Sequence, residues 1–166
     1  PVSPCPCSLV FRCDDARKQA TVLLAARIPT AADTDVSLVL QYDADHLLPG
    51  TVRLASGNDR LPQPQLDELL RHKNQRSDVK TLELSITHPA PLWCPDALPS
   101  PASEPALQQF VQLAKATTIH IVFDYKRLRK EHQGMFRAFS KAAKSLVGHP
   151  VDRALAELGL RKASWD

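Results

Sequence analysis

The N-terminal 42 residues contain three runs of hydrophobic positions in the pattern of β-strands. In residues 9–13 the side chains alternate, with Leu9, Phe11 and Cys13 on one face. Residues 20–28 are apolar on both faces except at Arg27, and residues 36–42 place Val36, Leu38, Leu40 and Tyr42 on one face. Because the connections between these runs are too short for a parallel crossover, the pattern predicts an antiparallel meander.

In the middle of the chain the hydrophobic pattern is less regular and predicts shorter elements. Residues 51–55 predict a short strand, and residues 65–73 predict a short helix with Leu66, Leu69 and Leu70 at helical spacing. Residues 80–87 alternate strictly between apolar and polar side chains, which indicates a half-exposed strand. Residues 89–105 contain six prolines, a composition incompatible with a regular helix or a central strand. We therefore expect a long irregular connection there, with Trp93 buried inside it.

The C-terminal third predicts alternating helix and strand. A helix follows Pro105, with Leu107, Phe110, Val111 and Ala114 on its apolar side. Residues 117–125 predict a strand that is apolar on both faces, and therefore central in its sheet, with a parallel pairing permitted. A long helix is expected over residues 130–147, ended by Gly148 and Pro150, and a last short helix over residues 151–158, ended by Gly159. Together these elements predict an α+β fold with a mostly antiparallel sheet and about four helices packed mainly on one face.

Length and composition fit one domain that covers residues 1–166, with an irregular segment at residues 1–7. The chain has 166 residues, of which 43% are hydrophobic, enough to bury a core. It does not begin with Met, so we expect it to be part of a longer protein. Five scattered glycines do not form a phosphate-binding loop, and no apolar run reaches the roughly 18 residues of a membrane helix. We expect no membrane association.

The four cysteines favour a reducing, intracellular compartment. Cys5, Cys7, Cys13 and Cys94 do not have zinc-ligand spacing, and Cys5-Pro6-Cys7 is too tight for an ordinary disulfide. We expect free thiols, with Cys13 buried as a small hydrophobic residue. We expect neither a metal ion nor a cofactor.

Positive charge is concentrated in the C-terminal part of the chain. The net charge is +3, but residues 1–100 carry 10 Lys/Arg against 12 Asp/Glu, whereas residues 101–166 carry 11 against 6. In the helix expected from Lys130, the basic side chains lie opposite the apolar side, and more basic residues precede it. This candidate anion-binding or nucleic-acid-binding surface consists of Lys126, Arg127, Lys130, Arg137, Lys141 and Lys144. The alternative explanation is the ordinary polar face of an amphipathic helix.

Two further interpretations concern this region. The run Lys126–Lys130 matches a short nuclear-import pattern, with an import receptor as a partner, unless the adjacent strand holds it rigid. His120 and Asp124, at the end of the strand expected at residues 117–125, are the candidate residues of a small enzyme site. A sheet-face role for His120 and a turn or capping role for Asp124 are the alternatives, and His132 falls on the apolar side of its helix. The usual catalytic motifs are missing, so the sequence favours a non-enzymatic protein.

Several segments resemble a group of uncharacterised proteins from filamentous fungi. They are Leu92-Trp93-Cys94-Pro95, residues 113–125, Gly148-His149-Pro150-Val151 and Ala163-Ser164-Trp165. The resemblance implies a fungal origin and an N-terminal globular domain followed by a Pro/Ser-rich tail, but no activity.

Taken together, we expect a non-enzymatic interaction module of an intracellular protein that binds an acidic protein or nucleic acid through this basic surface. The import pattern adds the nucleus as a candidate location. A self-association or scaffold domain, present as a homodimer, and a small enzyme at His120 and Asp124 are the alternatives.

Overall fold

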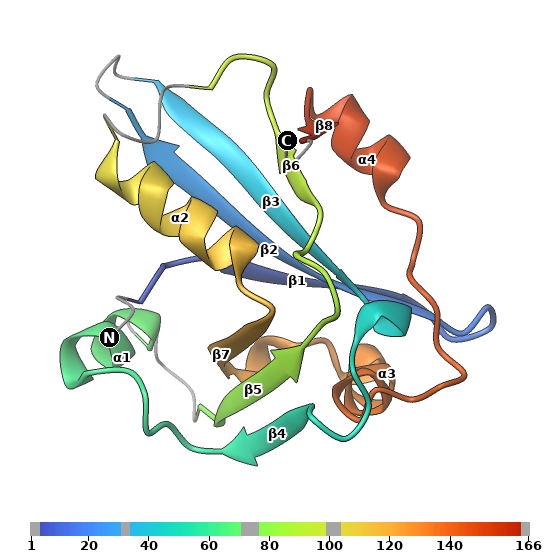
Figure 1. Ribbon diagram of the computed structural model, residues 1–166. Coiled ribbons are helices and arrows are strands. Elements are labelled where there is room, and N and C mark those ends of the chain that lie inside the picture. Colours follow the sequence, from blue (N-terminus) through green and yellow to red (C-terminus); the bar gives the residue numbers. More distant parts are fainter. Residues whose placement is uncertain (1–3, 31–33, 71–76, 99–103, 164–166) are drawn as a thin grey trace.

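The computed structural model describes residues 4–30, 34–70, 77–98 and 104–163, and it confirms the α+β class (Figure 1). The strands are β1 (Ser8–Asp14), β2 (Gln19–Pro29), β3 (Asp35–Asp43), β4 (Arg53–Ser56), β5 (Val79–Ser85), β6 (Leu92–Cys94), β7 (Thr118–Asp124) and β8 (Arg161–Lys162). The α-helices are α1 (Gln63–Leu69), α2 (Pro105–Lys115), α3 (Lys130–Ser140) and α4 (Asp152–Glu157). Two short 3-10 helices, η1 (Ala44–His46) and η3 (Tyr125–Arg127), follow β3 and β7.

The predicted meander forms most of a five-stranded antiparallel sheet in the order β1-β2-β3-β6-β8. In its register, Phe11 lies opposite Val22 and Leu24 opposite Leu40. Even-numbered residues of β2 and β3 therefore share one face of the sheet and odd-numbered residues share the other, because side chains alternate along a strand.

The prediction that the proline-rich connection contains no central strand is wrong. β6 pairs with β3 on one side and β8 on the other, with Trp93 opposite both Val39 and Lys162. The prolines at positions 91 and 95 flank the strand, so its three residues keep their backbone N–H groups for pairing. Trp93 is buried, as expected.

A second antiparallel sheet has the order β4-β5-β7. The strand expected to be central and open to parallel pairing, β7, instead lies at the edge of this sheet and pairs antiparallel with β5. Ile119, Ile121 and Phe123 are buried, whereas His120 and Val122 on the other face are only half-buried. The residues of β7 are therefore apolar on both faces because the second face is partly buried, and not because β7 has a neighbouring strand on each side.

Both sheets share one hydrophobic core, which fills the space between them. The even-numbered residues of β2 and β3 face it, together with buried side chains of β5, β7, α2 and α3. A smaller cluster on the opposite face of the first sheet is covered by α4 and consists of Leu23, Val39, Trp93, Val151, Leu155 and Leu160. Figure 1 shows α2 across the first sheet and α4 beside β8.

The helix expected over residues 130–147 is shorter than predicted, because α3 ends at Ser140. Ala142 adopts a left-handed backbone conformation (φ +50°), and the amide of Ala143 donates to the carbonyl of Ala138 at 3.2 Å. This is the hydrogen-bond pattern of a Schellman helix end, with alanine where glycine is usual. The chain then returns to the first sheet, where Val147 and Ala20 are joined by a backbone hydrogen bond of 2.8 Å.

The other helices lie close to their predicted ranges. α4 ends just before Gly159, which has φ +80°, as its sequence indicates. α1 spans Gln63–Leu69, and residues 71–73 of the predicted helix lie outside the described residues.

Candidate functional site

The six basic residues singled out from the sequence are all exposed, but they do not lie on one helix. Lys126 and Arg127 belong to η3, Lys130 begins α3, and Arg137 lies two turns later. Lys141 is the residue that caps the end of α3, and Lys144 lies in the turn beyond it. We refer to this set as the basic surface: Lys126, Arg127, Lys130, Arg137, Lys141 and Lys144.

Within the described part of the chain, none of these six side chains has an acidic partner within ion-pair distance. Other basic residues are paired: Arg161 lies 2.8 Å from Asp96, and Arg153 lies 3.4 Å from Glu157. The charge of the basic surface is therefore not neutralised locally, and it produces a positive potential that reaches about one Debye length, roughly 8 Å, into solution at physiological ionic strength.

The backbone that carries these residues is held in place by the core and by Asp124. The Asp124 carboxylate accepts hydrogen bonds from the backbone amides of Lys126 (3.1 Å) and Asp78 (3.0 Å), which confirms the predicted turn-capping role. Tyr125 is buried and Leu128 is half-buried between the charged residues. The side chains of the basic surface therefore extend from an ordered backbone, which fixes the positions of their Cα atoms.

His120 and Asp124 are not brought together. They lie four residues apart on one face of β7, a separation of about 13 Å between their backbones. Each has its own neighbour: His120 Nε2 lies 3.4 Å from Glu83 Oε2 on β5, and Asp124 caps the following turn. His132 packs edge-on against Phe11, as expected of a residue on the apolar side of α3.

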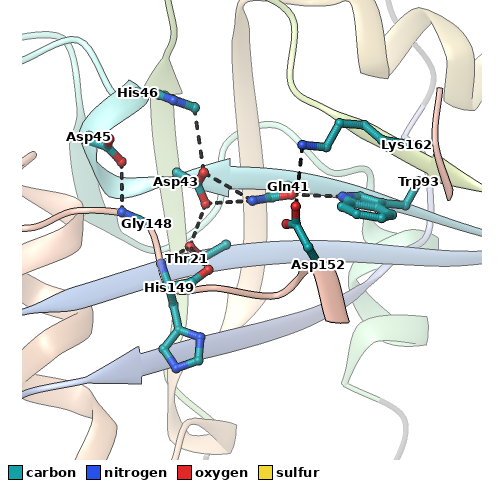
Figure 2. Close-up of polar contacts among 10 residues, drawn as sticks. All are labelled: Thr21, Gln41, Asp43, Asp45, His46, Trp93, Gly148, His149, Asp152 and Lys162. Atoms are coloured by element: carbon teal, nitrogen blue, oxygen red, sulfur yellow. Dashed lines mark hydrogen bonds and ion pairs between the residues drawn. The ribbon is translucent and has the colours of Figure 1, made fainter. Parts of the chain in front are cut away.

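A polar network that the sequence pattern did not predict lies on the α4 side of the first sheet (Figure 2). The Trp93 indole donates to the Gln41 side-chain oxygen at 2.8 Å, and the Gln41 amide donates to Asp43 at 3.0 and 3.1 Å. The Thr21 hydroxyl donates to Asp43 at 2.7 Å. Thr21 and Gln41 are buried, so these hydrogen bonds offset the free-energy cost of removing their polar groups from water.

The network extends to the segment before α4. The backbone amide of His149 donates to the Thr21 hydroxyl, and that of Gly148 donates to Asp45, both at 2.8 Å. Figure 2 shows Gly148 and His149 lying along the sheet beside Asp43 and Thr21. The sequence does place polar residues at odd-numbered positions of these strands, at Thr21, Gln41 and Asp43. Their spacing alone does not predict that side chains from two different strands contact one another.

A small pocket lies next to this network. It has a volume of about 150 Å³ and lies between the end of β3 and residues 86–91, with Gln41, His46 and His88 among its lining residues.

Three possible metal ligands lie close together in the described part of the chain: Asp43, Asp45 and His46 each offer one ligand atom within 4.8 Å of the others. Two of these groups already accept hydrogen bonds from the protein, Asp43 from Thr21 and Gln41, and Asp45 from Gly148, so a structural role explains the cluster.

The cysteines divide between core and core edge. Cys94 is buried in β6, whereas Cys5, Cys7 and Cys13 are half-buried and pack against the main core. Cys13 was expected to be buried, but β1 is the outer strand of its sheet and leaves it partly accessible.

No family model, curated protein or solved structure matches the chain. None of the described helices is both long and apolar enough to cross a membrane.

Proposed function

We propose that this protein is a non-enzymatic interaction module that binds an anionic partner through the basic surface. The observation that carries the proposal is that all six cationic side chains are exposed and lack acidic partners within the described residues. An amphipathic helix needs only a polar face, and mixed charges would serve that purpose. Six exposed cations without an ion-pair partner are better explained by a partner that supplies the opposite charge.

The ordered backbone supports the same proposal. Side chains that extend from a packed segment lose less conformational entropy on binding than side chains of a disordered tail. Along α3, Lys130 and Arg137 are about 10 Å apart along the helix axis, a distance that allows simultaneous contacts to several phosphates or carboxylates. Each phosphate contact releases counterions, so binding should weaken steeply with added salt.

The surface composition favours contact with a phosphate backbone or an acidic protein rather than stacking on bases. The large hydrophobic side chains exposed in the described ranges are Leu98, Val147 and Leu158, none of which is aromatic. Binding of single-stranded nucleic acid usually relies on aromatic stacking platforms. We therefore expect duplex nucleic acid, or an acidic protein segment, to bind better than a single strand.

The predicted import signal at residues 126–130 is better assigned to this surface. Import patterns of this kind are recognised as accessible basic peptides, whereas here Leu128 is half-buried and η3 is capped by Asp124. A nuclear location and a fungal origin remain predictions from the sequence. The same is true of self-association, for which β1 is one of the outer strands of the described sheets.

The test is a fluorescence-anisotropy titration with a labelled duplex, a labelled single strand and polyglutamate, each at two salt concentrations. Two triple variants are compared with the unmodified protein. The first carries Lys130→Gln, Arg137→Gln and Lys141→Gln, which remove three positive charges from the basic surface. The second carries Arg27→Gln, Arg53→Gln and Arg60→Gln, which remove three positive charges from exposed residues elsewhere. Each lowers the net charge from +3 to 0.

We expect the first variant to lose at least about tenfold in affinity and to reduce the slope of log affinity against log salt by up to about 0.9 per lost phosphate contact. The second should stay within about twofold of the unmodified protein. Tighter binding to polyglutamate than to duplex would assign the partner as an acidic protein. Equal losses in the two variants, or no binding of any probe at low salt, would overturn the proposal.

A further inference from the structure

β7 is a seven-residue strand at the edge of the second sheet, and one side of its backbone is open. Among the described strands, the order β4-β5-β7 gives β7 one neighbour, β5 (Figure 1). Residues 118–124 contain no proline, glycine or lysine, which are residues that commonly interrupt or protect an edge. β7 therefore keeps the backbone groups that an added strand needs.

The hydrogen bonds at the two ends of β7 show which of its backbone groups point away from β5. The Ile86 amide donates to the Thr117 carbonyl, and the Tyr125 amide donates to the Asp78 carbonyl, each at 2.8 Å. Both pairs continue the register between β5 and β7, so the odd-numbered residues of β7 exchange hydrogen bonds with β5. The even-numbered residues consequently direct their backbone N–H and C=O groups to the open side.

His120 and Val122 are the central residues on this open side. Outside the ladder between β5 and β7, no hydrogen bond within the described residues uses the backbone of either one, and both side chains are half-buried. Backbone groups in native proteins are almost always paired, with protein or with water, so these groups are available to a partner. An extended peptide that adds a strand here would pair with them and place alternate side chains beside His120 and Val122.

The segment that follows β7 supplies the charge that identifies the partner. Four exposed cations lie in η3 and at the start of α3: Lys126, Arg127, Arg129 and Lys130. β1 is an edge strand of the same length, but its corresponding end carries Asp14 and Asp15, which pair with Arg17 and Lys18. An acidic segment that continued past the end of β7 would meet unpaired cations, whereas at β1 it would meet two carboxylates.

We propose that β7 and the cations after it form one docking site for an acidic protein segment in extended conformation. This docking site rests on the proposed function, because the basic surface supplies most of its charge, and it assigns the partner as a protein. Antiparallel pairing is slightly the more stable arrangement, so the acidic residues precede the pairing residues in the partner's sequence. Glu83 lies 3.4 Å from His120 and favours uncharged side chains in the pairing part.

The test is a fluorescence-anisotropy titration of the full chain with a labelled peptide of four glutamates followed by six alternating valines and threonines. The control peptide has proline at every second pairing position, which keeps the charge and prevents strand pairing. Polyglutamate and a labelled duplex are the other probes. We expect the first peptide to bind at least about tenfold tighter than the proline peptide, because only the first can form hydrogen bonds with β7.

Two variants at Val122 separate strand pairing from charge. Val122→Pro removes the N–H on the open side and leaves the ladder intact, because this N–H does not pair with β5. Val122→Thr, the matched control, keeps both the N–H and a β-branched side chain. Val122→Pro should lose at least about tenfold in affinity for the peptide and less than about twofold for polyglutamate, whereas Val122→Thr should stay within about twofold for both.

Amide hydrogen exchange of the unmodified protein gives a readout that does not depend on how the variants fold. In the free protein, the amides of His120 and Val122 should exchange faster than those of Ile119 and Ile121, which pair with β5. Saturating peptide should slow exchange at His120 and Val122 by at least about tenfold and leave β1 unchanged.

Three results would overturn the docking site: no protection of either amide, equal binding of the proline peptide, or binding of the duplex without binding of the peptide. The last result would retain the basic surface as a nucleic-acid site. Failure of every anionic probe to bind at low salt would instead overturn the proposed function itself.

Discussion

At the scale of single residues, the structure depends on a few polar contacts that cross between distant parts of the chain. Asp43 lies at the end of β3 with its carboxylate held by Thr21 and Gln41. The backbone at Gly148 passes so close to this carboxylate that a Cβ atom built there would lie 2.5 Å from Asp43 Cγ. Glycine is required at this position because of the close approach of the backbone to the network.

Gly148→Ala should therefore destabilise the protein by about 1–3 kcal/mol, because Asp43 cannot move without losing its hydrogen bonds. The free energy of unfolding in urea measures this change. Gly134→Ala is the matched control: it lies inside α3, a Cβ there meets no atom within 4 Å, and alanine should stabilise the helix by about 0.5–1 kcal/mol. Equal effects at the two glycines would contradict the close-packing argument.

At the scale of elements, turns decide where strands and helices end. The hairpin between β1 and β2 contains Lys18 in a left-handed conformation (φ 53°), and its carbonyl accepts a hydrogen bond from Val147 at 3.0 Å. Its side chain is exposed and pairs with Asp15, a surface ion pair that contributes little to stability. The left-handed conformation of Lys18 thus costs free energy, and the hydrogen bond from Val147 connects the hairpin to the segment after α3.

Lys18→Gly should stabilise the protein by about 0.5 kcal/mol, because relief of the left-handed conformation exceeds the added entropy of the unfolded chain. Thermal unfolding followed by circular dichroism measures it. Arg17→Gly, in the same turn but without a positive φ, should be destabilising. A shift of the melting temperature in the same direction for both variants would show that the left-handed conformation of Lys18 carries no cost.

At the scale of the whole molecule, burial keeps several acidic groups protonated in the folded state. Burial raises the pKa of Tyr42, Cys13 and Cys94. The folded protein thus retains protons that the unfolded chain releases, and the free energy of unfolding falls as pH rises above the ordinary pKa values of these groups, 9.0 for cysteine and 10.0 for tyrosine.

Tyr42→Phe should therefore weaken the loss of stability at alkaline pH, by about 1 kcal/mol between pH 8 and pH 11. Urea unfolding at a series of pH values measures the effect. Near neutral pH the same variant should be at least as stable as the unmodified protein, because the lost hydroxyl makes no hydrogen bond within the part of the chain that the structure describes. Tyr125→Phe controls for removal of a hydroxyl, and an equal effect of the two variants would disprove the assignment to Tyr42.

The α+β class and the positions of most elements could be predicted from the sequence. Side-chain alternation predicted β1, β3 and β5, because the period of two is imposed by the backbone of each strand. A run that is apolar on both faces predicted β2. Burial of Trp93, the packing role of His132 and the turn role of Asp124 also followed from local patterns. The six cations of the basic surface were singled out from the sequence, and all are exposed in the structure, as is usual for charged side chains.

Only the tertiary structure decided which elements meet. β6 and β8 are three and two residues long, too short for a periodic signal, and they exist because β3 offers an unpaired edge. α3 ends at Ser140 because the chain must turn back to pair Val147 with β2, although its sequence would allow a longer helix. Thr21, Gln41, Asp43 and Trp93 become one network through strand register. Local propensity acts over a few residues, whereas register, edges and buried polar contacts depend on distant partners.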